Sequence, residues 1–184
     1  MRWSGASWWG RAAAPNDRPR QSTGAPVTAP SAPSAAPACA YTTYIQSTPE
    51  AVWRALTDEE ATAAYWGHAN VSDWQPGSPW EHRRTDGSGI ADVVGTVVAA
   101  TPPRRLVSTW SDPGDERPET TSQVTLEITP HSGGVRLTVT HEHLRDEEES
   151  RKAAEGWSMV LSNLKTYLET GRPMAVPPWA GHQS

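Results

Sequence analysis

The feature that most constrains the fold is a run of strand-like segments followed at once by one long amphipathic helix. Between residues 78 and 143, apolar and polar residues alternate in the segments SPWEHRR, ADVVGTVVAA, RRLVSTW, TSQVTLEIT and GVRLTVTHEH. Turn-forming stretches rich in Gly, Pro, Asp and Ser separate these segments. Consecutive strands with short connections predict an antiparallel meander.

Residues 147–170 are predicted to form the long helix. Asp146 and Glu149 are suited to cap its start, and Gly171 and Pro173 to end it. Apolar residues recur at intervals of three and four along one face: Trp157, Val160, Leu161, Leu164 and Leu168. Asn163 is expected on another face. At ~1.5 Å per residue the helix would be about 36 Å long, enough to lie across a whole sheet.

The last two predicted strands have one apolar and one polar face. The apolar residues are Val124, Leu126, Ile128, Val135, Leu137 and Val139. The alternating residues Thr125, Glu127, Arg136 and Thr138 are expected to face solvent. The apolar face of the sheet and the apolar stripe of the helix are both buried only if the helix lies on that face.

A strand and two short helices are predicted before the meander. Residues 41–46, YTTYIQ, are typical of a strand. Thr48 and Pro49 suit the start of a first helix, and Thr57 with Glu60 has the spacing of a capping box for a second helix in EEATAAYW. The fold class is therefore predicted to be α+β.

The composition divides the chain into one domain and two flanking segments. Residues 1–39 are rich in Ala, Pro, Ser and Thr and are expected to be disordered and dispensable for thermal stability. Residues 40–173 are expected to form a single domain, followed by a flexible tail at residues 174–184. Because no apolar run resembles a signal peptide or a membrane span, a cytoplasmic protein is expected. Cys39 is the sole cysteine, which excludes an intramolecular disulfide.

Several functional classes are disfavoured by the sequence. The formal net charge is −5, and no basic stripe interleaved with aromatic residues is present, so nucleic acid is not an expected partner. The chain contains no G-x-S-x-G, P-loop or G-x-G-x-x-G motif and no convincing pair of catalytic carboxylates. No catalytic residue and no cofactor are therefore assigned, and enzymatic activity is left open.

The order of elements and several local words resemble a known superfamily. The words are STPEAVWRALTDEE, VSDWQPGSPW, VVGTVVAATPPRRLVSTW, VRLTVTHEHL and GWSMVLSNLKTYLETG. From Tyr41 to about Pro173 the chain resembles the SRPBCC or START-like superfamily, in the bacterial branch related to the activator of the 90-kDa heat-shock protein ATPase. This resemblance implies a helix-grip fold, in which a curved antiparallel sheet wraps around the C-terminal helix.

The resemblance also implies a cavity between sheet and helix that holds a small, mainly apolar molecule, in a stress or regulatory response. The candidate pocket residues are Trp80, His82, Trp110, Leu126, Leu137, Val139, His141, Trp157 and Leu161. The tryptophans have a second interpretation as plain core residues, since the chain has ten tryptophans and no phenylalanine to fill its interior. The functional alternatives are a filled cavity with a protein partner or homodimer, a chaperone ATPase activator, or a cofactor-independent enzyme such as a cyclase.

The polar residues considered for the pocket each have more than one interpretation. His141 and His143 continue the apolar face of their strand and either point inward or lie at its frayed edge. Arg84 follows His82 by two residues and is a candidate partner for a ligand carboxylate. A metal site built from His82, His141 and His143 is considered, but no metal is assigned.

Overall fold

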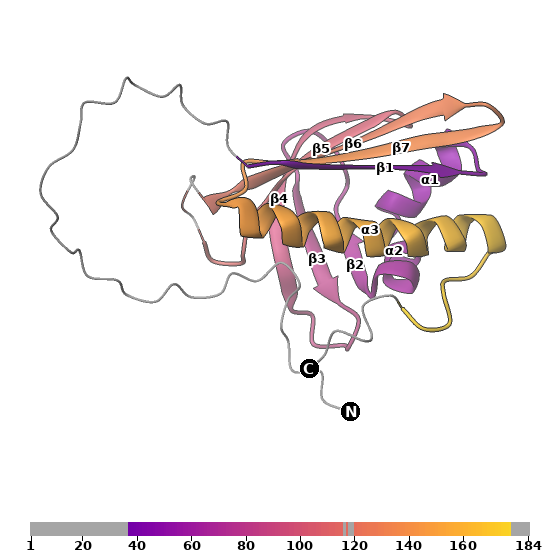
Figure 1. The fold of residues 1–184 in the computed structure, drawn as a ribbon. Coiled ribbons are helices and arrows are strands. Elements are labelled where there is room, and N and C mark those ends of the chain that lie inside the picture. The colour runs from indigo at the N-terminus through magenta and orange to yellow at the C-terminus, as the bar shows by residue number, and fades with distance from the viewer. Residues whose placement is uncertain (1–36, 116, 118–119, 178–184) are drawn as a thin grey trace, which may run out of the picture.

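The computed structural model describes residues 37–115, 117 and 120–177. These residues form a seven-stranded antiparallel sheet with the order β1-β7-β6-β5-β4-β3-β2, and three helices (Figure 1). The elements are β1 (Cys39–Ile45), α1 (Pro49–Thr57), α2 (Glu59–Trp66), β2 (His68–Val71), β3 (Pro79–Arg84), β4 (Ala91–Thr101), β5 (Arg105–Trp110), β6 (Ser122–His131), β7 (Gly134–Glu142) and α3 (Glu147–Thr170).

The sheet curls around the long helix α3, which lies across its concave face (Figure 1). The short helices α1 and α2 lie beside the C-terminal half of α3 and close that end of the molecule. The register of β4 shifts between Val97 and Ala99, and such irregularities bend a strand. The α+β helix-grip architecture predicted from the order of elements is confirmed.

Local sequence signals fix the starts of the helices. The side chains of Thr48 and Asp146 accept hydrogen bonds from the backbone N–H groups of Ala51 and Glu149, as predicted. The predicted capping box at Thr57 is wrong. Asp58 is the N-cap of α2, and its Oδ1 accepts from the N–H of Ala61 at 2.8 Å. A carboxylate one residue further along accepts this bond, while the Thr57 hydroxyl bonds back to α1.

The edge strand β1 is closed by side chains of α3. Lys165 Nζ donates to the carbonyl oxygen of Tyr44 at 2.5 Å, and Glu169 accepts from the N–H of Gln46 at 2.8 Å. Lys165 and Glu169 also form an ion pair at 2.6 Å. These contacts occupy backbone groups that an edge strand would otherwise offer to another chain.

The opposite edge strand, β2, was not predicted. It has four residues and follows α2 after one left-handed glycine, Gly67. Its Asn70 N–H donates to the hydroxyl of Thr62 on α2 at 2.9 Å, and the strand pairs with β3 in antiparallel register. A strand this short carries too few alternating residues to be recognised from sequence.

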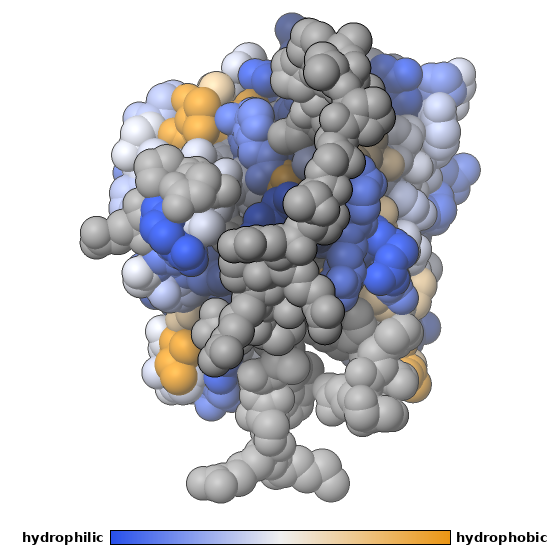
Figure 2. Space-filling model, turned by 60° about the vertical axis from the view of Figure 1, so that its left-hand side comes forward, coloured by the Kyte–Doolittle hydropathy of each residue, from blue (hydrophilic) through white to orange (hydrophobic). Residues whose placement is uncertain are grey.

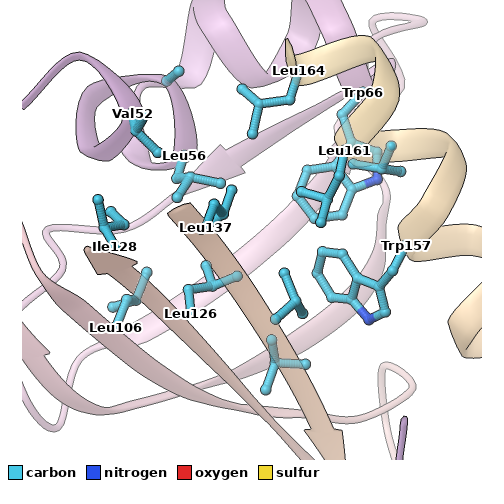
Figure 3. Packing of buried hydrophobic residues seen from close by; sticks show 14 of the residues in the cluster. Val52, Leu56, Trp66, Leu106, Leu126, Ile128, Leu137, Trp157, Leu161 and Leu164 are labelled. Carbon is cyan, nitrogen blue, oxygen red and sulfur yellow. The ribbon is translucent and has the colours of Figure 1, made fainter. Parts of the chain in front are cut away.

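The hydrophobic core lies between α3 and the concave face of the sheet, as the two apolar stripes predict. Trp157, Leu161 and Leu164 of α3 point toward Leu126 and Leu137 of the sheet (Figure 3). All five of these side chains are buried. Packing of the helix stripe onto the sheet stripe is therefore confirmed.

Two residues expected outside the core are buried. Thr125, at the centre of the sheet, has cross-strand neighbours Val107 and Thr140 and is 8% exposed, so the convex face is not uniformly solvated. Asn163 is 1% exposed. Its amide donates to the carbonyl of Tyr65 at 2.6 Å and accepts from the N–H of Met174 at 2.7 Å. This amide joins α3 to α2 and to the segment that follows α3.

Residues just outside the predicted domain of residues 40–173 make hydrogen bonds with it. β1 begins at Cys39, and two carbonyls before it, of Pro37 and Ala38, accept hydrogen bonds from Leu144 N and Ser150 Oγ. The expected disorder of residues 1–39 lies mainly outside the described residues, as does the end of the tail. Met174 is the first residue of that expected tail, and its N–H is bound to Asn163.

Among the described residues, few large apolar side chains are exposed. On the face shown in Figure 2, hydrophobic residues form small separate patches among polar ones. The large hydrophobic residues that are exposed in the described part of the chain are Tyr44, Ile90, Val98 and Val176. Within the described residues, no helix has the length and apolar character needed to cross a membrane.

Candidate functional site

The nine predicted pocket residues come together in the interior. Trp80 and His82 lie on β3, Trp110 on β5, Leu126 on β6 and Leu137 on β7. The remaining four are Val139 and His141 on β7 and Trp157 and Leu161 on α3, with the two α3 residues facing the sheet. All nine are no more than 8% exposed. The structure thus gathers them at the interface between sheet and helix, and their role toward a ligand stays a prediction.

Six ring side chains meet in what we call the aromatic cluster: Trp66, Trp80, His82, Trp110, His141 and Trp157. The ring centroids of Trp110 lie 4.9 Å from Trp80 and 5.5 Å from Trp157. Trp66 lies 5.5 Å from Trp157 and 4.8 Å from His82, both edge to face. These are favourable distances and geometries for aromatic pairs. Five elements, α2, β3, β5, β7 and α3, contribute to the cluster.

A glycine on β4 allows Trp80 to reach across the sheet. Gly95 is the cross-strand partner of Trp80, and the Trp80 indole N–H donates to the carbonyl of Thr109 on β5 at 2.8 Å. A Cβ atom at residue 95 would lie 1.8 Å from that carbonyl oxygen and 2.4 Å from the indole nitrogen. No side chain fits there, so glycine is needed for this close approach.

His141 is held by a directed chain of hydrogen bonds. The indole N–H of Trp157 donates to His141 Nδ1 at 3.4 Å, which makes Nε2 the protonated nitrogen. Nε2 then donates to the hydroxyl of Ser122 at 2.8 Å, and that hydroxyl donates to the carbonyl of Trp110 at 3.3 Å. Burial lowers the pKa of His141 to about 4. The inward orientation is correct, the frayed-edge alternative is wrong, and the imidazole is neutral.

His82 is also buried and neutral, and its partners differ. Its Nδ1 lies 2.7 Å from Asn70 Oδ1, which can only accept, so Nδ1 carries the proton. Its ring stacks on His68 at 4.2 Å with an interplanar angle of 7°. Burial, and to a lesser degree the nearby His68, lowers the pKa of His82 well below its ordinary value.

Arg84 is engaged by a carboxylate of the protein itself. Its guanidinium donates through Nε and Nη2 to Asp92 on β4 at 2.6–3.0 Å, and His68 Nε2 lies 3.0 Å from the same carboxylate. Partial burial raises the pKa of Asp92, but the hydrogen bonds from Arg84 and His68 outweigh this and hold it below its ordinary value. The predicted role of Arg84 toward a ligand carboxylate is therefore not supported.

The considered metal triad does not form. His143 lies beyond the end of β7, is exposed, and adopts a left-handed backbone with φ of 61° at the turn into α3. Of the two alternatives for His143, the inward orientation is wrong and the position at the end of the strand is correct, because β7 ends at Glu142. In the described part of the chain, no three His, Cys, Asp or Glu side chains form a metal-binding group.

Four residues around the cluster were missed by the sequence analysis: Trp66, Asn70, Ser122 and Tyr65. Trp66 and Tyr65 end α2, where Ala61, Thr62, Tyr65 and Trp66 are buried. Ala61 and Tyr65 are four residues apart, as are Thr62 and Trp66. This helical spacing could have indicated from the sequence that Tyr65 and Trp66 lie on the buried face of α2. The side chains of Asn70 and Ser122 are hydrogen-bonded to His82 and His141, which lie on other strands, so no local pattern marks them.

The curved sheet, the long helix on its concave face and the ring-lined interior together define a protein of the SRPBCC or START-like, helix-grip class. The profile of the family described as "Activator of Hsp90 ATPase homolog 1-like protein" matches residues 46–169. This match spans more than half of the chain, and the protein belongs to this family. No curated protein sequence matches the chain.

Solved structures support the same fold. ChR145 from Cytophaga hutchinsonii is 27% identical with a TM-score of 0.61, over 73% of this chain and 95% of that one. PFC0360w, an HSP90 activator from Plasmodium falciparum, is 21% identical with a TM-score of 0.59, over 74% and 97%. DynU16, from the dynemicin biosynthetic locus, is 24% identical with a TM-score of 0.63, over 74% and 49%.

Proposed function

We propose that the protein binds a small, mainly apolar molecule between α3 and the concave face of the sheet, against the aromatic cluster. The observation that carries this proposal is the convergence of six aromatic or imidazole rings from five elements at one place in the interior. Binding sites for small molecules are concave and mostly apolar, with a few placed polar groups.

The electrostatics of the cluster favour an uncharged ligand. His82 and His141 are both neutral, because burial lowers the pKa of each. The two guanidinium groups on β3 are already paired, that of Arg83 with Glu81 and that of Arg84 with Asp92. A charged ligand would therefore lose its hydration without gaining an ionic partner from these residues.

A neutral fluorescent probe tests the proposal. N-phenyl-1-naphthylamine should bind the intact protein, gain emission and quench tryptophan fluorescence, because four indoles line the proposed site. Trp157→Ala should weaken binding more than Trp53→Ala, since Trp53 lies on α1 outside the cluster. Native mass spectrometry of the purified protein should show a co-purified apolar molecule.

The opposite results would refute the ligand proposal. If no neutral probe binds and Trp157→Ala lowers the free energy of unfolding by about 3–5 kcal/mol, the ring is plain core. The interior is then filled by its own side chains.

The second candidate function is that of a module that binds a protein partner or a second copy of itself. It is favoured by the family, whose description names an Hsp90 ATPase activator, and by the fold shared with an HSP90 activator. Fold and family do not by themselves transfer function. A pull-down with purified Hsp90 and an ATPase assay test this candidate directly, and unchanged ATPase turnover with no complex would refute it.

A further inference from the structure

The buried indoles differ in whether their N–H groups have a partner. Those of Trp80, Trp110 and Trp157 donate to Thr109 O, Ser108 Oγ and His141 Nδ1, at distances of 2.8, 3.1 and 3.4 Å. His141 uses both of its ring nitrogens. This side of the cluster therefore satisfies its polar atoms internally.

Three neighbouring buried rings each keep a polar atom without a hydrogen bond to any residue in the described part of the chain. The Tyr65 hydroxyl has no partner, and Tyr65 is 0% exposed. Trp66 Nε1–H makes no hydrogen bond, and this residue is 7% exposed. His82 uses Nδ1 for Asn70, which leaves the lone pair of Nε2 without a donor.

These three side chains adjoin one another through Trp66. The Trp66 ring centroid lies 6.2 Å from Tyr65 and 4.8 Å from His82. The same indole packs edge to face on Trp157, and Figure 3 shows the two indoles close together beneath α3. The three rings therefore lie on the α2 side of the aromatic cluster and not in a distant part of the core.

The chemistry of the three atoms is complementary to one kind of polar group. Trp66 Nε1 donates, His82 Nε2 accepts, and the Tyr65 hydroxyl can do either. In the described part of the chain the Tyr65 hydroxyl is the one fully buried side-chain polar atom without a partner. Such groups are rare and costly, so a ligand that completes this hydroxyl gains affinity. A hydroxyl is the smallest neutral group that both accepts and donates a hydrogen bond. A carboxylate would present no donor to His82 and would meet no free cation, since Arg84 is held by Asp92.

We propose that the α2 side of the cluster recognises a neutral hydroxyl group carried by a planar aromatic ligand, through Tyr65, Trp66 and His82. This inference rests on the proposed function, since it specifies the polar end of the ligand bound at that same site. The rings of the cluster hold the aromatic body, and the three unpartnered atoms select the hydroxyl.

Two probes that differ by a single hydroxyl test the inference. Binding of 2-naphthol and of naphthalene to the full chain is measured by isothermal titration calorimetry at neutral pH, where 2-naphthol is uncharged. The intact protein should bind 2-naphthol roughly tenfold more tightly, as expected for a hydrogen bond that completes buried polar groups.

Conservative variants locate the preference. Tyr65→Phe and Trp66→Phe each remove a polar atom and keep an aromatic ring, and each should reduce the preference to roughly threefold or less. Tyr44→Phe is the matched control. Tyr44 is 52% exposed on β1 and lies outside the cluster, so this variant should keep the tenfold preference. Circular dichroism melting confirms that each variant is folded.

The possible results distinguish a failure of hydroxyl recognition from a failure of ligand binding as a whole. Equal affinity for both probes in the intact protein, or a preference that survives in both test variants, would overturn hydroxyl recognition and leave ligand binding intact. If neither probe binds, the ligand site fails and hydroxyl recognition fails with it.

Discussion

Replacing Tyr65 by phenylalanine is predicted to stabilise the protein in the absence of ligand. The Tyr65 hydroxyl is buried without a hydrogen-bond partner in the described part of the chain, while its ring packs against Trp66 and Tyr167. Burial also raises the pKa of this hydroxyl, which keeps it protonated. Phenylalanine keeps the ring contacts and removes only the unpartnered oxygen.

The magnitude follows from the cost of an unmade hydrogen bond. A buried polar group without a partner costs about 1–3 kcal/mol, and the oxygen also contributes some packing. The free energy of unfolding should therefore rise by about 1–2 kcal/mol, which corresponds to about 3–8 °C in the melting midpoint of a domain of this size. Stability gained at a binding site at the expense of ligand recognition is a common trade-off.

Urea denaturation followed by far-UV circular dichroism measures the effect. The midpoint should move upward with an unchanged dependence on urea concentration. Tyr44→Phe is the control, since Tyr44 is 52% exposed, and its effect should stay within about 0.5 kcal/mol. If Tyr65→Phe instead lowers the free energy of unfolding by about 1 kcal/mol or more, the hydroxyl has a partner in solution and the reasoning is wrong.

Further predictions concern the packing and the buried polar groups. Leu161→Ala, at a residue that is 0% exposed, should lower the free energy of unfolding by about 2–5 kcal/mol in urea denaturation. Gly95→Ala should release the indole of Trp80 from Thr109, seen as a shift in tryptophan emission, and a wild-type spectrum and stability would contradict the clash. Asn163→Ala should cost about 2–4 kcal/mol, because it leaves the carbonyl of Tyr65 and the N–H of Met174 unpaired. Burial lowers the pKa of His141 from 6.5 to about 4, so between these values the unfolded chain binds more protons than the folded one. Stability should then fall as the pH falls through this window, by about 2 kcal/mol near pH 5, and His141→Gln should make the loss smaller by that amount.

The order of strands and helices could be predicted from the sequence because the patterns that indicate them lie within each element. Alternation of apolar and polar residues with a period of two indicated five strands of the sheet. The apolar stripe from Trp157 to Leu168, with its flanking cap residues, predicted α3 with the bounds that the structure has. The cap at Asp146 and the left-handed Gly171 depend only on residues within a turn of each helix end. The rule that two apolar faces must cover each other then placed the helix on the sheet.

Tertiary structure decided which polar residues enter the core. Asn163 shares its helix with exposed residues, yet it is buried because the end of α2 packs there and presents the carbonyl of Tyr65. His141 is buried and His143 is exposed because β7 ends between them. Burial of these side chains depends on contacts with elements that are distant in the sequence, and the periodicity within one strand or helix does not indicate such contacts.

The candidate site was predicted as a set of residues but not as an arrangement. From the sequence, Trp80, His82 and His141 were candidates for the interior, and an edge position for His141 stayed open. Their tautomers and partners follow from contacts between residues 12 to 29 positions apart in sequence, such as Asn70 with His82 and Trp80 with Thr109. Only the packing of α2 in the assembled domain brings the Trp66 ring to those of Tyr65, His82 and Trp157 and leaves the Tyr65 hydroxyl buried without a partner in the described part of the chain, because hydrogen-bond satisfaction is a property of the assembled core.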